Sequence, residues 1–204
     1  MKGDSLYVAE DFVSKILNKD KIKTVIELGA RDCDDTPALE RIYPTAQIYS
    51  IECNPHQADT CKKNLEKTNR TTFIQKAITN YSGWKNFYVY PDTEDNPMGH
   101  GSSSLYDHVE DFMTITSVQC TTGKQLVKEY NLSHIDVLCM DIQGSEYEAL
   151  LSFEDFINNI DYIIFEDDAH RYKKPVQNCL HTFLKNNKFE LIHHQSDYLY
   201  KRIF

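Results

Sequence analysis

The stretch Thr24-Val25-Ile26-Glu27-Leu28-Gly29-Ala30-Arg31-Asp32-Cys33 decides the fold that this sequence predicts. The three apolar residues before the glycine include two β-branched ones and form a run too short for a helix, which is typical of a buried strand in a parallel sheet. A helix-like segment begins at Thr36, which we expect to be the N-cap, with Pro37 at the first helical position. A strand, a glycine turn and a helix make the first βα unit of a doubly wound fold, where ligands bind outside the carboxyl ends of the strands.

A second predicted strand, residues 47–51, ends in Glu52, which lies 23 residues after Gly29. This spacing is close to that of the ribose-binding acid in nucleotide-binding βαβ units. A carboxylate in this place accepts hydrogen bonds from both ribose hydroxyls, whereas the competing interpretation is a solvated glutamate at a strand end. Ala77 and Ile78, at the end of the third predicted strand, suit the flat face of an adenine, although such residues also suit any strand end.

The remaining elements follow from hydrophobic periodicity and turn residues. In the first half of the chain we expect a flanking helix within residues 1–20, a helix from 54 to about 67, a third strand at 71–78 and an antiparallel strand at 84–90. A strand at 114–121 and a helix at 123–130 should then return the chain to the sheet. Residues 189–194 and 198–203 should form a closing antiparallel hairpin. Residues 91–104 form a long irregular loop, and such loops are commonly binding loops or lids, with disorder as the competing interpretation. We expect this loop, together with the neighbouring Tyr106, to cover the substrate.

Two further buried strands end in carboxylates. Residues 135–140 lead to Asp141, and residues 161–165 lead to Glu166 and Asp167. Since neighbouring parallel strands end at the same edge of a sheet, we expect these three carboxylates to converge, although a run of acids in isolation is also a solvated turn. Converging carboxylates repel one another unless they are protonated or share a cation. A divalent metal with oxygen ligands, Mg²⁺ or Mn²⁺, is therefore predicted there.

The composition limits the class of protein. With 204 residues, the chain suits one α/β domain spanning residues 1–204. The net charge of −9 disfavours a nucleic-acid partner, which needs clustered Lys and Arg, and is compatible with a neutral, polyhydroxylated substrate. No apolar run approaches the roughly 18 residues of a membrane span, and the polar N-terminus lacks the apolar core of a signal peptide. The six cysteines form no C-x-x-C pair, so we expect mostly buried thiols in a reducing, cytoplasmic compartment.

Four motifs carry a family resemblance: Glu27-Leu28-Gly29-Ala30, Glu52-Cys53-Asn54-Pro55, Gly101-Ser102-Ser103-Ser104-Leu105 and Asp141-Ile142-Gln143-Gly144-Ser145-Glu146. The last is the most specific, because it is similar to the D-x-[EQ]-G-x-E signature of FkbM-type methyltransferases. From about residue 24 to the C-terminus the chain resembles this family, and more distantly it resembles glycan-modifying methyltransferase domains of large algal viruses. It departs from the family pattern at Arg31 and Cys33, which replace an asparagine and a glycine of the cofactor loop, and at Cys139, where a lysine often precedes the aspartate.

The resemblance implies a Rossmann-like class I methyltransferase, an α/β fold whose seven-stranded, mostly parallel sheet ends in an antiparallel hairpin. It implies methyl transfer from S-adenosyl-L-methionine, usually to a hydroxyl oxygen, and here to a hydroxyl of a sugar or glycan. The residues expected to hold the cofactor are Glu27, Gly29, Ala30, Arg31, Asp32, Glu52, Ala77 and Ile78. Asp141, Glu166 and Asp167 also look like the metal ligands of magnesium-dependent sugar O-methyltransferases.

A sugar hydroxyl is a poor nucleophile at neutral pH, so methyl transfer to it needs alignment and a base. His170, three residues beyond Asp167, is the first candidate for this base, with a surface histidine as the competing interpretation. Glu146 is the second candidate, although a carboxylate in a first helical turn often serves only the helix dipole. Asp141 completes the predicted catalytic group, and a metal bound to it would make the acceptor hydroxyl more acidic.

Two other protein classes compete with this prediction. A nicotinamide-dependent Rossmann oxidoreductase would share the first two βα units, but it needs a fuller G-x-G-x-x-G loop and a Tyr/Lys or His/Asp catalytic set, and neither is evident. A non-catalytic nucleotide-binding module would keep the glycine turn without needing acids at the later strand ends. Nucleobase N-methylation is disfavoured, because Asp141-Ile142-Gln143-Gly144 stands where a [DN]-P-P-[FYW] sequence is expected.

Overall fold

The computed structural model describes residues 18–92, 99–107, 114–166, 176–194 and 197–203. The flanking helix expected within residues 1–20 falls almost wholly outside these residues, as do Asp167 and His170. In the part of the chain that is described, no helix combines the length and the apolar character that crossing a bilayer requires.

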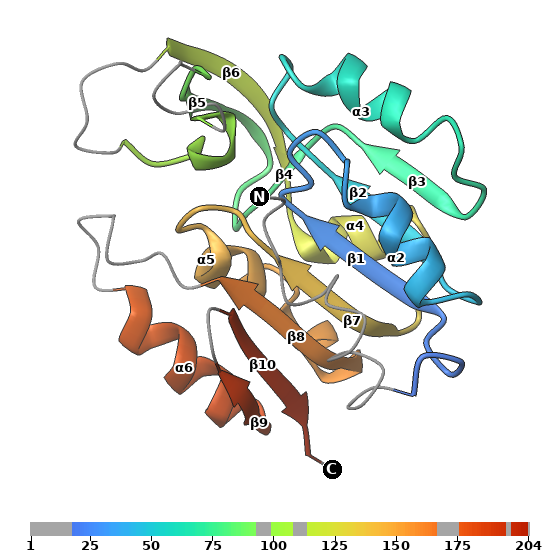
Figure 1. The fold of residues 1–204 in the computed structure, drawn as a ribbon. Helices are drawn as coiled ribbons and strands as arrows, with labels where there is room; N and C mark the ends of the chain where they lie inside the picture. The colour runs from blue at the N-terminus through green and yellow to red at the C-terminus, as the bar shows by residue number, and fades with distance from the viewer. Residues whose placement is uncertain (1–17, 93–98, 108–113, 167–175, 195–196, 204) are drawn as a thin grey trace.

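A seven-stranded sheet forms the centre of the molecule. Its strands are β1 (Thr24–Leu28), β2 (Gln47–Ile51), β3 (Thr71–Ile74), β7 (Ile135–Met140), β8 (Ile160–Glu166), β9 (Phe189–His194) and β10 (Asp197–Arg202). They lie in the order β3-β2-β1-β7-β8-β10-β9 (Figure 1). Strands β1, β2, β3, β7 and β8 pair in parallel, and β10 pairs antiparallel with both β8 and β9. The predicted mostly parallel sheet with a closing antiparallel hairpin is confirmed.

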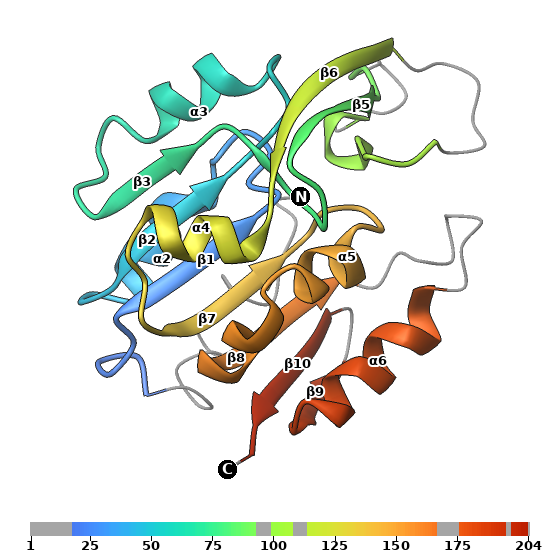
Figure 2. The same ribbon diagram turned by 180° about the vertical axis from the view of Figure 1, so that it is seen from behind.

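Helices cover both faces of this sheet. The described α-helices are α2 (Thr36–Ile42), α3 (Ala58–Asn64), α4 (Gly123–Glu129), α5 (Glu146–Leu151) and α6 (Val176–Asn186). Two short 3-10 helices are also described, η2 (Gly99–Ser102), which lies in the loop predicted to be irregular, and η3 (Glu154–Asn159). Helix α2 lies on one face, and α4, α5 and α6 lie on the other, as Figure 1 and the opposite view in Figure 2 show. The alternation along β1 explains this arrangement, because Val25 packs with Leu39 of α2, whereas Ile26 packs in the cluster that contains Leu126 of α4 and Leu150 of α5.

A second sheet stands beyond the carboxyl ends of β1 and β7, in the direction of their arrowheads (Figure 1). It consists of β4 (Ala77–Ile78), β5 (Gly83–Val89) and β6 (Thr114–Thr121), in the order β4-β6-β5. The prediction of one strand over residues 71–78 is wrong, because β3 pairs with β2 whereas β4 pairs with β6. Residues 114–121 do form a strand, but it joins this second sheet instead of returning to the main one, and its antiparallel partner is β5.

Two helix starts also differ from the sequence prediction. Thr36 is not the N-cap of α2, because Asp35 occupies that place and the Thr36 hydroxyl donates to Glu27 instead. The helix expected from residue 54 begins four residues later, as α3. The reason is that Asn54 forms a turn, in which its side chain and its carbonyl both accept backbone N–H groups.

Candidate active site

The glycine turn after β1 is fixed by its neighbours. Gly29 has a φ of +83°, and a Cβ built on it would lie 1.8 Å from the carbonyl oxygen of Asp141. The N–H groups of Gly29 and Ala30 both donate to the Ile51 carbonyl, at 2.9 and 3.1 Å. The turn therefore lies between the ends of β2 and β7, in a place and a conformation that only glycine accepts.

Glu52 lies beside this turn and is nearly buried. Its Oε2 accepts the Arg31 N–H at 2.9 Å, and its Oε1 accepts the Asn54 N–H at 2.6 Å. Burial raises the pKa of Glu52 to about 7, although these N–H groups act in the opposite direction. A carboxylate offers about four acceptor positions, so Glu52 keeps acceptor capacity for hydroxyl groups such as those of a ribose.

The residues that follow the turn are braced by α3. Arg31 and Cys33 have φ values of +50° and +58°, a left-handed region that costs free energy for residues with a Cβ. The Asp32 Oδ1 pairs with the Arg31 Nε at 3.1 Å, and the Asp32 carbonyl accepts the Asn64 Nδ2 at 2.8 Å. The Cys61 thiol donates to the Arg31 carbonyl at 3.1 Å. The predicted cofactor residues from Gly29 to Asp32 thus form one tightly held loop beside Glu52.

Glu27 is enclosed beneath α2 and is 1% exposed. Its Oε2 accepts the hydroxyl of Thr36 at 2.7 Å and the hydroxyl of Ser50 at 2.8 Å. Burial raises the pKa of Glu27 to about 7. Glu27 therefore joins β1, β2 and α2 just before the glycine turn, and its direct contact with a cofactor stays a prediction.

Ala77 and Ile78 form β4, and both are buried. Ala77 packs in a small apolar cluster with Phe87, and Cys53 packs against the same cluster. Because Cys53 directly follows Glu52, this apolar surface lies close to the acid. The adenine-binding role of Ala77 and Ile78 stays a prediction.

The end of β7 lies level with the glycine turn on one side and with the end of β8 on the other. The residue before Asp141 is the register partner of the residue before Gly29 and of the residue before Glu166. The predicted adjacency of the two acid-ended strands is therefore confirmed. Glu166 is in turn paired with Asp197 of β10, a buried acid that the sequence reasoning had placed only in a hairpin turn.

Metal-ligating side chains also gather at the other end of the sheet. In the described part of the chain, the one group of three such side chains within 4.8 Å of one another is His134, Asp136 and Asp161, at the amino ends of β7 and β8. The predicted ligands Asp141 and Glu166 lie on adjacent strands, and Asp167 is outside the described residues. The metal site at the carboxyl edge stays a prediction.

The loop from Asp141 to α5 is held by its own side chains. Gln143 Nε2 donates to Asp141 Oδ1 at 2.6 Å. Glu146 Oε1 accepts the N–H groups of Ile142 and Gly144 at 3.1 and 3.3 Å. Burial is the main reason that the pKa of Glu146 is raised to about 8. These contacts favour a supporting role for Glu146, and its role as a base stays a prediction.

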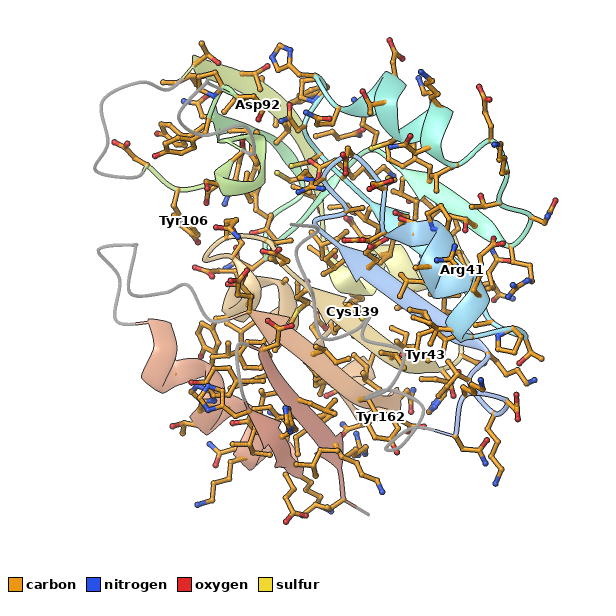
Figure 3. All side chains as sticks on the ribbon, viewed as in Figure 1. Arg41, Tyr43, Asp92, Tyr106, Cys139 and Tyr162 are labelled. Atoms are coloured by element: carbon orange, nitrogen blue, oxygen red, sulfur yellow. The ribbon has the colours of Figure 1, made fainter. Side chains whose placement is uncertain are left out.

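Residues 99–104 of the predicted substrate loop, together with residues 105–107, lie against this Asp141 loop, and residues 93–98 of the predicted loop are outside the described residues. The Ser104 hydroxyl donates to the Gln143 carbonyl at 2.6 Å, and the Tyr106 hydroxyl donates to Glu148 of α5. Tyr106 lies between the three-stranded sheet and α5 (Figure 3). The segment thus connects the second sheet to the loop that carries Asp141.

The same segment reaches the glycine turn. A Cβ built on Gly101 would lie 3.6 Å from the Arg31 side chain, which is ordinary van der Waals contact. Tyr106 was expected to cover the acceptor together with the substrate loop, whereas Gln143 and Glu148 were not predicted as site residues from the sequence. The D-x-[EQ]-G-x-E motif contains the signal for Gln143, whereas the contact between Tyr106 and Glu148 joins residues 42 positions apart and has no local signal.

Known sequences that are similar to this chain are methyltransferases. The family model described as the methyltransferase FkbM domain matches residues 27–198. The 2-O-methyltransferase NoeI of Sinorhizobium fredii (strain NBRC 101917 / NGR234) is 23% identical over 170 residues, which cover 79% of this chain and 69% of that protein.

Solved structures show the same fold. The methyltransferase FkbM from Methylobacillus flagellatus KT superposes with a TM-score of 0.61 at 15% identity, covering 96% of this chain and 47% of that one. A putative rRNA-methylase from Clostridium thermocellum has a TM-score of 0.57 at 10% identity, with 100% and 98% covered. This chain therefore spans about half the length of the Methylobacillus flagellatus protein. Because the family model extends from β1 to β10, the chain belongs to the FkbM family of S-adenosylmethionine-dependent methyltransferases.

Proposed function

We propose that this protein transfers the methyl group of S-adenosylmethionine to a hydroxyl oxygen of a sugar or glycan. The observation that carries the proposal is the position of Asp141, whose side chain accepts the Gln143 amide at the carboxyl edge of the sheet. The backbone carbonyl of Asp141 lies against the glycine turn, and the Gln143 carbonyl, two residues later, accepts the Ser104 hydroxyl. The likeness to a relative named as a 2-O-methyltransferase supports oxygen as the accepting atom.

In this proposal the cofactor lies along the carboxyl ends of β1 and β2. Its ribose hydroxyls donate to Glu52, its methionine end follows residues 29–32, and its adenine packs against Ala77 and Ile78. Burial is the main reason that the pKa values of Glu52 and Glu146 are raised, and the charge of Asp141 acts in the same direction. Such surroundings attract the positive sulfonium of the cofactor more strongly than the neutral thioether that remains after transfer.

Asp141 then serves the acceptor. Methyl transfer is an in-line displacement, so the attacking oxygen must be aligned with the methyl group and must lose its proton. In the proposal Asp141 accepts a hydrogen bond from the acceptor hydroxyl, residues 99–107 cover the acceptor, and His170 remains a second candidate base. Asp141 and Glu166 offer only oxygen donors, which fits Mg²⁺ or Mn²⁺, with Asp167 as a third ligand. When bound, such a cation would lower the pKa of the acceptor hydroxyl.

The test is a transfer assay with S-adenosylmethionine carrying an isotope-labelled methyl group and a set of uncharged oligosaccharides. We expect mass spectrometry to find the labelled methyl group on a sugar oxygen, and fragmentation to identify the hydroxyl. Glu52→Ala provides the control, because it should weaken cofactor binding while the acceptor site remains. Label on a nucleobase, or only on nitrogen or carbon atoms, would contradict the proposal.

A chelation series tests the metal separately. We expect EDTA to stop the transfer and Mg²⁺ or Mn²⁺ to restore it, because the carboxylates at this edge would again repel one another without a cation. His134→Ala is the matched control, since it removes one of the three side chains of the group at the amino edge and should leave the EDTA response unchanged. Full activity in excess EDTA would contradict the metal while leaving methyl transfer in place.

A further inference from the structure

Gln143 stands in a backbone conformation that its residue type disfavours. Its φ is +50°, in the left-handed region, where a side chain with a Cβ costs free energy that glycine does not. The next residue, Gly144, has a φ of +91°, so the turn already contains one glycine in this region. Gln143 nevertheless has a long side chain where glycine would fit without strain, and the residue is only 6% exposed.

The side-chain amide and the backbone carbonyl of Gln143 both form hydrogen bonds at the candidate site. Its side-chain amide donates to Asp141 Oδ1 at 2.6 Å, and its backbone carbonyl accepts the Ser104 hydroxyl at 2.6 Å. The same Ser104 oxygen accepts the Tyr106 N–H at 3.0 Å. A single residue therefore links the carboxylate of Asp141 to the segment that contacts the second sheet.

We propose that Gln143 is a positioning residue for methyl transfer, which fixes the Asp141 carboxylate relative to residues 99–107. The strained backbone is retained because the side chain holds one oxygen of Asp141, and local strain of this kind collects at functional sites. The hydrogen bond to Oδ1 thereby limits the rotation of the Asp141 carboxylate. This inference rests on the proposed role of Asp141.

Through Gln143, residues 99–107 also affect the orientation of the Asp141 carboxylate. The Ser104 hydroxyl donates to the backbone carbonyl of Gln143, and the side-chain amide of Gln143 donates to Asp141. The hydrogen bond from Ser104 therefore stabilises the turn that orients Asp141. A misplacement of the reacting groups by a fraction of an ångström is enough to slow transfer strongly.

Two substitutions of Gln143 separate positioning from stability. Gln143→Gly relieves the backbone strain and removes the amide, and Gln143→Met keeps the side-chain length but removes the hydrogen bond. We expect both to lower kcat by about tenfold to a hundredfold, the usual effect of removing a group that orients an active-site ligand. The affinity for S-adenosylmethionine, measured by calorimetry, should stay within about twofold, and the Tm of Gln143→Gly should stay within a few degrees of the parent.

Lys188→Gly is the matched control. Lys188 has a φ of +62° in the turn before β9 and is exposed, so this substitution relieves the same kind of strain away from the site. We expect an equal or higher Tm and an unchanged kcat. If both Gln143 variants keep the parent kcat within about twofold, or if cofactor affinity falls as much as kcat, positioning by Gln143 is overturned.

A double-mutant cycle with Asp141→Asn identifies the group through which Gln143 acts. If Gln143 works through Asp141, Gln143→Met should cost little further activity in the Asp141→Asn background. Equal losses in both backgrounds would overturn the inference. An inactive Asp141→Asn with a fully active Gln143→Met overturns only the positioning role, whereas a fully active Asp141→Asn overturns the proposed role of Asp141 itself.

Discussion

The two edges of the parallel sheet use carboxylates in different ways. At the amino edge, Asp136 Oδ2 accepts the N–H groups of Lys23 and Thr24, both at 2.8 Å. His134 Nε2 lies 3.0 Å from Asp161, and both side chains are partly exposed. Acids in this setting keep some exposure to solvent and have a backbone N–H or an imidazole partner, so they tie strand ends together at little desolvation cost.

Three acids at the carboxyl edge are nearly buried. Burial raises their pKa to about 7 or 8, and these acids are Glu27, Glu52 and Glu146. The loops around them are also strained: of the six non-glycine residues with positive φ in the described part of the chain, three lie at this edge, namely Arg31, Cys33 and Gln143. Desolvated acids and strained backbone at one edge mark the functional end of the sheet.

The largest effect is expected from Gly29→Ala. The added Cβ would collide with the Asp141 carbonyl oxygen in a backbone region that alanine disfavours, so we expect a loss of about 2–4 kcal/mol in the free energy of unfolding and no measurable cofactor binding. Chemical denaturation and calorimetric titration measure the two. Gly101→Ala is the control at the same edge, since its Cβ finds only an ordinary contact at 3.6 Å. Equal stability of the two variants would show that the glycine turn is not the fixed point of the site.

The next effect concerns cofactor affinity. Glu52→Ala removes an acceptor of two backbone N–H groups and, in our proposal, of the ribose hydroxyls, so we expect S-adenosylmethionine to bind roughly tenfold to a hundredfold more weakly. Asp161→Ala removes a carboxylate from the amino edge and should leave the affinity unchanged. A Glu52→Ala variant that binds as tightly as the parent, or a parent that prefers NADH, would contradict the ribose assignment.

A smaller effect is expected in the pH dependence of stability. The folded protein holds the protons of Glu27, Glu52 and Glu146 more tightly than the unfolded chain, whose carboxyl pKa is about 4.5. The stabilisation from these groups is therefore complete below pH 4.5 and is lost as the pH rises to between 7 and 8. Glu146→Gln cannot ionise, so its Tm should fall by a few degrees less than that of the parent between pH 5 and pH 8. Parallel Tm curves for the two proteins would show that Glu146 does not titrate in this window.

The smallest effect is expected at the amino edge. His134→Ala removes the partner of Asp161, but the side chains of this pair are 44% and 31% exposed, so solvent screens the interaction. We expect a change below about 1 kcal/mol in the free energy of unfolding and no change in methyl transfer. A loss of activity in this variant would break the contrast between the two edges.

Local patterns were sufficient for much of the fold. Strand β1 and its glycine were evident because a short β-branched run followed by glycine has few other uses. The N-cap at Thr36 was predicted wrongly for an instructive reason: a threonine before a proline is a good local cap, but its hydroxyl serves Glu27 on a neighbouring strand. The division of residues 71–78 between two sheets could not be predicted either, because the residue pattern of a strand does not indicate which strand it pairs with.

The sequence by itself determined the strand–glycine–helix unit, the acid that ends the next strand and the motif around Asp141, because each depends on residues close together in the chain. Only the tertiary structure decided that Gly29 must be a glycine against the Asp141 carbonyl and that Ser104 reaches Gln143. These contacts join residues 112 and 39 positions apart. Hydrophobic periodicity encodes which face of an element is buried, whereas register and hydrogen-bond partners are set by how distant elements pack against one another.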